Sequence, residues 1–145
     1  MFQNSASKRN VFLLLLKGIK KMSFQYNAYL FLYRKSRSRD RKQQLFKLLE
    51  SKSKFIHLVF ETFQEYYSLI QLWNIEMYFR RIKKDIFRNL TGMQNVEYDL
   101  NMDFVDVEKS NLSFLRDMLR KISEPSFRNL FLRHQFELKS ILATV

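Results

Sequence analysis

The residues of this sequence most able to do chemistry are its arginines and lysines, which are gathered in short runs. The stretch LYRKSRSRDRKQQ, residues 32–44, holds six cations and one anion. Because arginine guanidinium groups match the geometry of phosphate oxygens, this pattern is typical of a surface that binds a polyanion. Smaller basic groups at residues 8–9, 20–21 and 80–88 would extend that surface. We expect nucleic-acid phosphates to be bound by Lys8, Arg9, Lys20, Lys21, Arg34, Lys35, Arg37, Arg39, Arg41, Lys42, Arg80, Arg81 and Lys84.

A solvated helix face is the alternative explanation for these cations. It fits residues 80–88 best, because Ile82 and Ile86 would form the buried side of the same helix. It fits residues 34–42 less well, since the four arginines there have only Asp40 as a local counter-charge. Four aromatic residues just before this run could stack on bases or belong to the core: Tyr26, Tyr29, Phe31 and Tyr33.

The sequence offers no constellation for catalysis. It contains no cysteine, and its two glycines are too few for a phosphate-binding or dinucleotide-binding loop. The two histidines, His57 and His134, each lack a second histidine or a cysteine at ligand spacing. We therefore expect no enzyme activity, no metal ion and no cofactor.

A short acidic segment invites comparison with calcium-binding loops. Its acids are Glu97, Asp99, Asp103, Asp106 and Glu108. The segment lacks the loop glycine and the terminal glutamate spacing of an EF-hand. We interpret it as an exposed strand face or as a patch that docks a basic neighbour.

The charge of the chain is large and unevenly distributed. The net charge is +12, and residues 1–60 carry 14 cations against 2 anions. Such an excess destabilises a compact state by self-repulsion unless an anionic partner is near, and nucleic acid, an anionic membrane surface or an acidic protein would serve. At 145 residues the chain is expected to be a single domain, with a basic arm over residues 1–50 and a helical core over residues 53–145.

The spacing of apolar residues predicts a mostly α-helical, irregular fold. The basic N-terminal part is expected to be helical, with Gly18 weakening or ending its first helix. The clearest pattern covers residues 53–90, where an apolar residue recurs at every third or fourth position from Ile56 to Met77. We predict one long amphipathic helix there, with Trp73 buried in its apolar stripe.

The C-terminal part is expected to contain one extended segment and two helices. Apolar and acidic residues alternate across residues 95–107, which is a strand signal, although no second strand is evident. Ser110 is expected to cap a helix over residues 111–122. Pro125 fits the first turn of a last helix that runs to about Leu142.

Three features bear on localisation. The longest charge-free run is Met22–Tyr33, twelve residues, which is shorter than the roughly 20 residues that a membrane span needs. The first acid of the chain is Asp40, and such an acid-free, serine-containing start resembles a mitochondrial targeting helix. Glycine, proline and alanine are scarce, whereas Phe, Tyr, Met, Ile, Asn and Lys abound, which indicates an AT-biased gene such as those of many organelles, protists or parasites. We expect a mitochondrial (organellar) location.

Two short matches resemble the mitochondrial LYR-motif family. Leu32-Tyr33-Arg34 equals its tripeptide, and RRIKKDIFRN, residues 80–89, is similar to its later basic helix with one extra residue. That resemblance would imply a small, basic, three-helix accessory or assembly subunit, many of which bind an acylated carrier protein. The two matches lie farther apart than in that family, and the apolar residue expected after the tripeptide is missing, so we do not assign the chain to it.

These features favour a non-catalytic structural subunit of a large assembly. We expect an RNA-binding component of an organellar (mitochondrial) ribosome or of another ribonucleoprotein, with rRNA and neighbouring protein subunits as partners. The alternative is an accessory subunit of a mitochondrial respiratory membrane complex that lies on the membrane surface. A small DNA-binding or viral factor is a third option.

Overall fold

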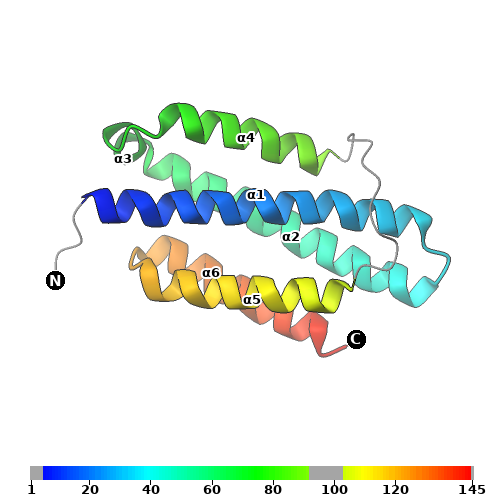
Figure 1. Ribbon diagram of the computed structural model, residues 1–145. Coiled ribbons are helices and arrows are strands. Elements are labelled where there is room, and N and C mark those ends of the chain that lie inside the picture. The colour runs from blue at the N-terminus through cyan, green and yellow to red at the C-terminus, as the bar shows by residue number, and fades with distance from the viewer. Residues whose placement is uncertain (1–4, 92–102, 145) are drawn as a thin grey trace.

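The computed structural model describes residues 5–91 and 103–144, and these residues form helices joined by short connections (Figure 1). The expectation of a mostly α-helical protein is confirmed, and the described residues include no strand. The helices are α1 (Ser5–Lys35), α2 (Arg39–Glu65), α3 (Tyr67–Leu72), α4 (Glu76–Leu90), α5 (Phe104–Lys121) and α6 (Pro125–Leu142).

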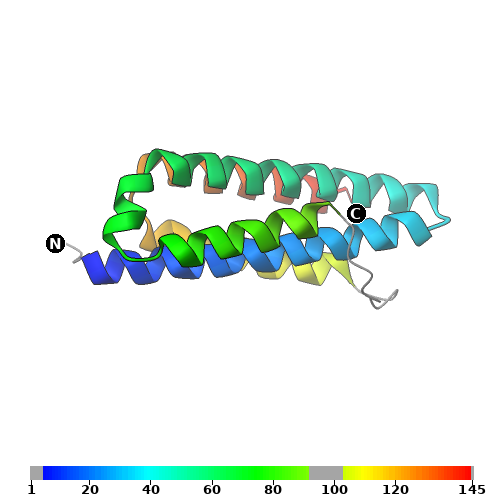
Figure 2. The same ribbon diagram turned by 90° about the horizontal axis from the view of Figure 1, so that it is seen from above.

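The helices form two layers. Helix α1 lies between α4 and α5 in one layer, and α2 and α6 lie side by side in the other (Figures 1 and 2). The short helix α3 crosses between the layers at one end (Figure 2). Residues 5–35, expected to belong to a basic arm, thus occupy the middle of the helical core. The reason is the apolar stripe from Phe12 to Met22, which recurs at helical spacing and is almost entirely buried.

The prediction of one helix over residues 53–90 is wrong. Helix α2 ends at Glu65, and the chain turns back through α3 and Asn74, whose φ of 57° is a left-handed conformation that asparagine tolerates better than most residues. A straight helix would have left its wide apolar face uncovered. Reversal instead brings Phe79 of α4 against Phe60 and Phe63 of α2, with ring centroids 5.5 and 5.6 Å apart.

The segment predicted to be extended, residues 95–107, is only partly described. Residues 95–102 lie outside the described residues, whereas residues 104–107 are the first turn of α5, so the extended prediction is wrong there. The physical reason is a buried stripe at helical spacing that begins at Phe104 and continues to Met118. Asp103 caps the helix, because its Oδ1 accepts a hydrogen bond from the Val105 N–H at 2.9 Å. Helix α5 therefore begins before the predicted cap at Ser110, whereas α6 begins at Pro125 as predicted.

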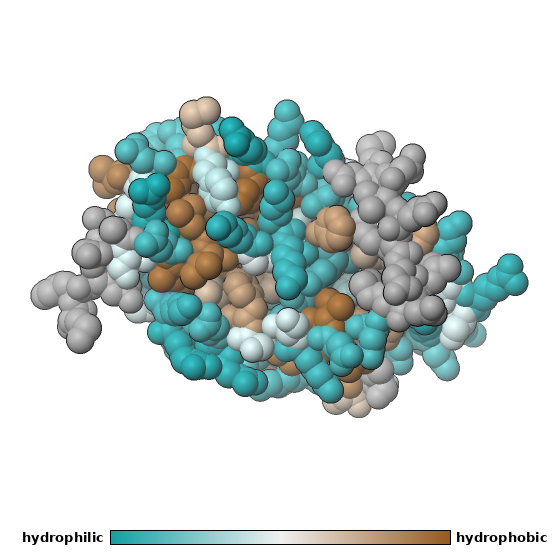
Figure 3. All heavy atoms as spheres, in the orientation of Figure 1, coloured by the Kyte–Doolittle hydropathy of each residue, from teal (hydrophilic) through white to brown (hydrophobic). Residues whose placement is uncertain are grey.

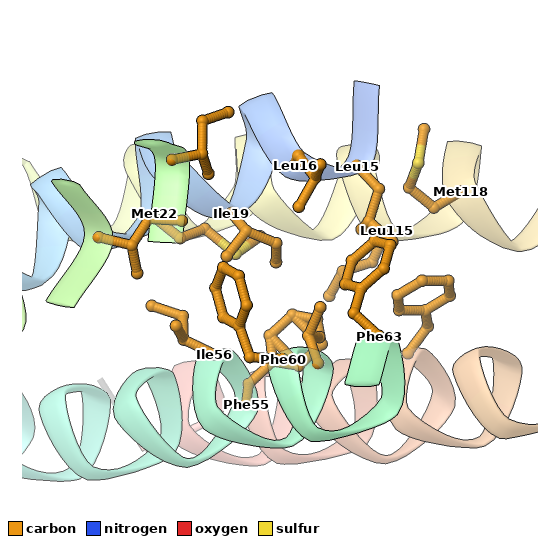
Figure 4. Close-up of a cluster of buried hydrophobic side chains, with 14 of the residues drawn as sticks. Leu15, Leu16, Ile19, Met22, Phe55, Ile56, Phe60, Phe63, Leu115 and Met118 are labelled. Carbon is orange, nitrogen blue, oxygen red and sulfur yellow. The ribbon is translucent and has the colours of Figure 1, made fainter. Parts of the chain in front are cut away.

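The core lies between the two layers (Figure 4). Leu15, Leu16 and Ile19 of α1 face Ile56, Phe60 and Phe63 of α2 in this view. Trp73 is buried as predicted. It lies at the C-terminal end of α3 rather than within one long helix, and it stacks on Phe12 with ring centroids 5.1 Å apart.

Gly18 does not end the first helix, contrary to expectation. Helix α1 continues through it to Lys35. A Cβ atom at this position would collide with the ring of Phe114, which lies in α5. The glycine therefore allows α5 to pack closely against α1.

Candidate nucleic-acid interface

The basic run of the sequence forms the connection between α1 and α2. Helix α1 ends at Lys35, and Ser38 starts α2 by accepting a hydrogen bond on its Oγ from the Arg41 N–H at 3.3 Å. Only three residues separate the two antiparallel helices, so cations from both sides of the connection are held at one end of the molecule. We call Arg34, Lys35, Arg37, Arg39, Arg41 and Lys42 the basic corner.

Four of the six residues of the basic corner have no ion-pair partner in the part of the chain that the structure describes. Arg34, Lys35, Arg37 and Arg39 are exposed, and no ion pair is formed by any of them within residues 5–91 and 103–144. The side chains that project at the right-hand end of Figure 3, where this connection lies, are mainly hydrophilic. Two lysines touch aromatic rings instead, since Lys42 Nζ lies 5.1 Å from the ring centre of Tyr33 and Lys35 Nζ lies 5.9 Å from that of Phe31.

The other cations predicted to bind phosphate lie elsewhere, and several are engaged in holding the fold. Lys8 pairs with Glu124 at 3.6 Å, and Lys20 pairs with Asp85 at 3.5 Å, which ties α1 to α4. Arg80 pairs with Glu76 at 2.6 Å and donates a hydrogen bond to the Tyr67 hydroxyl at 3.2 Å. The hydrogen bond with Tyr67 and the charge of Glu76 raise the pKa of Arg80, which keeps it charged.

Four of the predicted cations outside the basic corner are exposed and have no ion pair among the described residues. They are Arg9, Lys21, Arg81 and Lys84. Arg9 lies near the start of α1, whereas the basic corner lies at its end. The thirteen predicted residues are therefore distributed along the molecule, and the basic corner is the part that the fold gathers most closely.

Sequence reasoning missed two residues beside the basic corner, Phe46 and Lys47. Phe46 follows the basic run on α2, and its side chain is 54% exposed. The signal was present in the sequence, because Leu45, Leu48 and Leu49 define the buried stripe of α2 and place Phe46 outside it. The ring of Phe46 lies beside that of Tyr33, with centroids 6.4 Å apart.

One of the aromatic residues proposed to stack on bases is instead part of a buried polar cluster. Tyr29 is fully buried and donates a hydrogen bond to Glu108 Oε1 at 3.1 Å. Burial, together with the negative charge of Glu108, raises the pKa of the Tyr29 hydroxyl, so it stays protonated. Lys52 Nζ lies 2.7 Å from Glu108 Oε1, and both side chains are 0% exposed.

Two amides complete this cluster. Asn111 donates to Glu108 Oε2 at 2.9 Å and to Gln25 Oε1 at 2.7 Å, and Lys52 also donates to Gln25. The cluster joins α1, α2 and α5 and is closed to solvent. We therefore assign it to the fold rather than to ligand binding. Glu108 was among the five acids expected to form an exposed strand face or to dock a basic neighbour, and it pairs instead with Lys52 of its own chain. Two of the other acids, Glu97 and Asp99, lie outside the described residues.

The two histidines lie apart. His57 is exposed, and its Nδ1 lies 2.7 Å from the carbonyl oxygen of Ser53. His134 is buried, stacks on Phe55 and places its Nδ1 3.3 Å from the hydroxyl of Ser51. Within residues 5–91 and 103–144, no three His, Cys, Asp or Glu side chains are arranged to hold a metal ion.

Burial of His134 predicts a stability that falls in mild acid. Burial, with a smaller contribution from the charge of Lys52, lowers the pKa of His134 to about 3. The unfolded chain has a histidine pKa near 6.5, so between these values the unfolded state binds more protons and stability is lost as pH falls. From pH 7.5 to 5.0 this one group should cost about 2 kcal/mol. Urea unfolding at the two pH values measures it, and His134→Asn should flatten the difference; an equal pH dependence in both proteins would contradict the assignment.

The comparisons with known proteins supply no relative. No protein-family model, no curated protein sequence and no solved structure matches this chain. Each described helix is also either too short or too polar to cross a membrane.

Proposed function

We propose that this protein is a non-catalytic structural subunit of a large assembly and that it binds RNA phosphates through the basic corner. One observation carries the proposal: Arg34, Lys35, Arg37 and Arg39 are exposed on the short connection and on the two helix ends that it joins, and they form no ion pair among the described residues. Guanidinium groups held in this way would bind phosphate oxygens in pairs without reading the base sequence.

Helix electrostatics support a ligand for part of this surface. Arg34 and Lys35 lie in the last turn of α1, where cations are favoured by the helix dipole, so folding alone explains them. Arg39 lies at the first position of α2, where the dipole disfavours a cation, and Arg37 precedes it in the connection. Arg37 and Arg39 thus lie near the positive end of the α2 dipole, and Asp40 is the acid in that first turn. Binding of an external anion would therefore stabilise these two arginines most.

Composition supports the finer proposal of an organellar ribosome or another ribonucleoprotein. The net charge of +12 suits a protein that packs against RNA, and the AT-biased residue usage suits an organellar gene. Exposed apolar side chains away from the basic corner would contact neighbouring protein subunits. Leu72 and Met77 are each 78% exposed, and Phe136 is 75% exposed.

The proposal predicts RNA binding that weakens steeply with salt. If about four to six cations contact phosphates, a plot of the logarithm of the association constant against that of the salt concentration should have a slope of roughly −3 to −5. Fluorescence anisotropy of a labelled RNA, titrated with the purified full chain at 50 to 300 mM KCl, measures this slope. An association that is insensitive to salt, or no association at 50 mM KCl, would contradict the proposal.

A second candidate function is an accessory subunit that lies on the surface of a membrane complex. The specific observation in its favour is the corner between α3 and α4, where Leu72 and Met77 are largely exposed and Arg81 lies one turn further along α4. Apolar side chains of this kind can enter the headgroup region while cations meet anionic lipids. Binding to anionic vesicles rather than to RNA in the same titration would favour this candidate.

A further inference from the structure

A groove runs along α1 and α2 beside the basic corner. It consists of two hollows of about 620 and 460 Å³ that share Tyr33 and Phe46 as lining residues. Volumes of this size fall in the range of roughly 300–1,000 Å³ that small ligands occupy. The groove therefore offers a concave, partly aromatic surface next to Arg37 and Arg39, which form no ion pair among the described residues.

The lining of the groove combines charge with an accessible ring. The hollow nearer the connection is lined by Arg39, Lys42 and Lys47 of α2, together with Phe46 of the same helix. Phe46 is 54% exposed, so a ligand can reach part of its side chain. In the second hollow, Glu50 is the only acid among the lining residues that the structure describes, and Lys54 lies beside it.

A ligand for this groove needs both negative charge and a flat apolar surface. Proteins bind single-stranded nucleic acid by stacking bases on aromatic rings and by pairing backbone phosphates with cations. Each stacked base contributes substantially to the free energy of binding. A base within a duplex has no free face of this kind. A lipid headgroup would use the cations, but it would leave the exposed ring of a concave surface without a partner.

We propose that the groove binds one unpaired nucleotide of a single-stranded RNA segment, with its base stacked on Phe46 and its phosphates on Arg39, Lys42 and Lys47. This inference rests on the proposed function and extends it, because the basic corner alone would not distinguish single strands from duplexes. Tyr33 supports the ring of Phe46 from the α1 side, and Lys42 lies over Tyr33.

The test compares Phe46→Ala with Phe24→Ala by fluorescence anisotropy. Phe24 is a matched control, because it is also a phenylalanine with about half of its side chain exposed, at 47%, and it does not line the groove. The probes are a labelled single-stranded oligoribonucleotide of mixed sequence, a labelled RNA duplex of the same length and anionic phosphatidylserine vesicles. Circular dichroism checks that both variants keep their helix content.

Phe46→Ala should weaken binding of the single-stranded RNA by about 5- to 100-fold. Its affinity for the duplex and the salt dependence of its binding should stay close to those of the unchanged protein. Phe24→Ala should leave both affinities unchanged, and Phe46→Trp should retain single-strand binding.

If the unchanged protein binds RNA and Phe46→Ala binds the single strand equally well, the stacking site is wrong while the proposed function stands. If the unchanged protein binds neither RNA, both fail. Loss of vesicle binding alone on Phe46→Ala would assign the groove to lipid and overturn the inference.

Discussion

Glu108→Leu is expected to lower the free energy of unfolding by about 3–5 kcal/mol, because it removes the only counter-charge that the structure shows for the buried ammonium of Lys52. Both side chains are fully buried, so water does not compensate for the loss. The Tyr29 hydroxyl would lose its acceptor as well. Urea unfolding followed by circular dichroism at neutral pH measures the change.

The double variant Lys52→Met/Glu108→Leu is the control for this prediction. Removing both charges together leaves no unpaired buried ion, and apolar replacements of similar size are often neutral. Gln25 and Asn111 keep the hydrogen bond between their side chains. The double variant should therefore recover most of the stability lost by Glu108→Leu. A single variant as stable as the unchanged protein would show that Lys52 reaches solvent, contrary to the structure.

Arg37→Glu/Arg39→Glu is expected to weaken RNA binding by about 100-fold at 0.1 M salt. Each phosphate contact contributes close to one unit of salt slope, so losing two contacts costs nearly two decades of affinity at this concentration, and the new carboxylates repel phosphate. Folding should be preserved, because position 39 begins α2, where the helix dipole favours an acid. Fluorescence anisotropy gives the affinity, and circular dichroism gives the helix content.

Two matched variants separate a local effect from one of net charge. Arg116→Glu/Arg133→Glu makes the same change of four charge units on exposed arginines of α5 and α6, and it should weaken binding much less. Arg37→Lys/Arg39→Lys keeps the charge but loses the paired guanidinium geometry, so it should weaken binding only partly. If both charge-reversed proteins lose affinity equally, the basic corner has no special role.

Periodicity predicted the helical content of the fold but not its path. The stripe from Ile56 to Met77 is continuous in the sequence, and nothing in its spacing marks the reversal at Asn74. The reversal depends on packing between helices, in which Phe79 and Phe87 of α4 contact Phe60, and Phe79 also contacts Phe63. The start of α5 was missed for a related reason, since the alternating pattern before Phe104 concealed the buried helical stripe that follows it.

The candidate site was predictable to the extent that it depends on local composition. Six cations in a short run indicate an anion-binding surface wherever they lie in the fold. The ion pairs between helices were not predictable, because Lys20 of α1 pairs with Asp85 of α4 and Lys52 of α2 pairs with Glu108 of α5. Within the run SKSK, Lys52 looks like a solvated lysine, and only the phase of the buried stripe places it inside.

The most direct test of RNA binding through the basic corner is sedimentation of the tagged full chain from a cell extract, after treatment with ribonuclease or with detergent. The protein is expected to sediment with an RNA-containing particle in detergent and to be released by ribonuclease, whereas Arg37→Glu/Arg39→Glu should remain at the top of the gradient. Sedimentation with membranes, release by detergent and no effect of ribonuclease would rule out RNA binding through the basic corner.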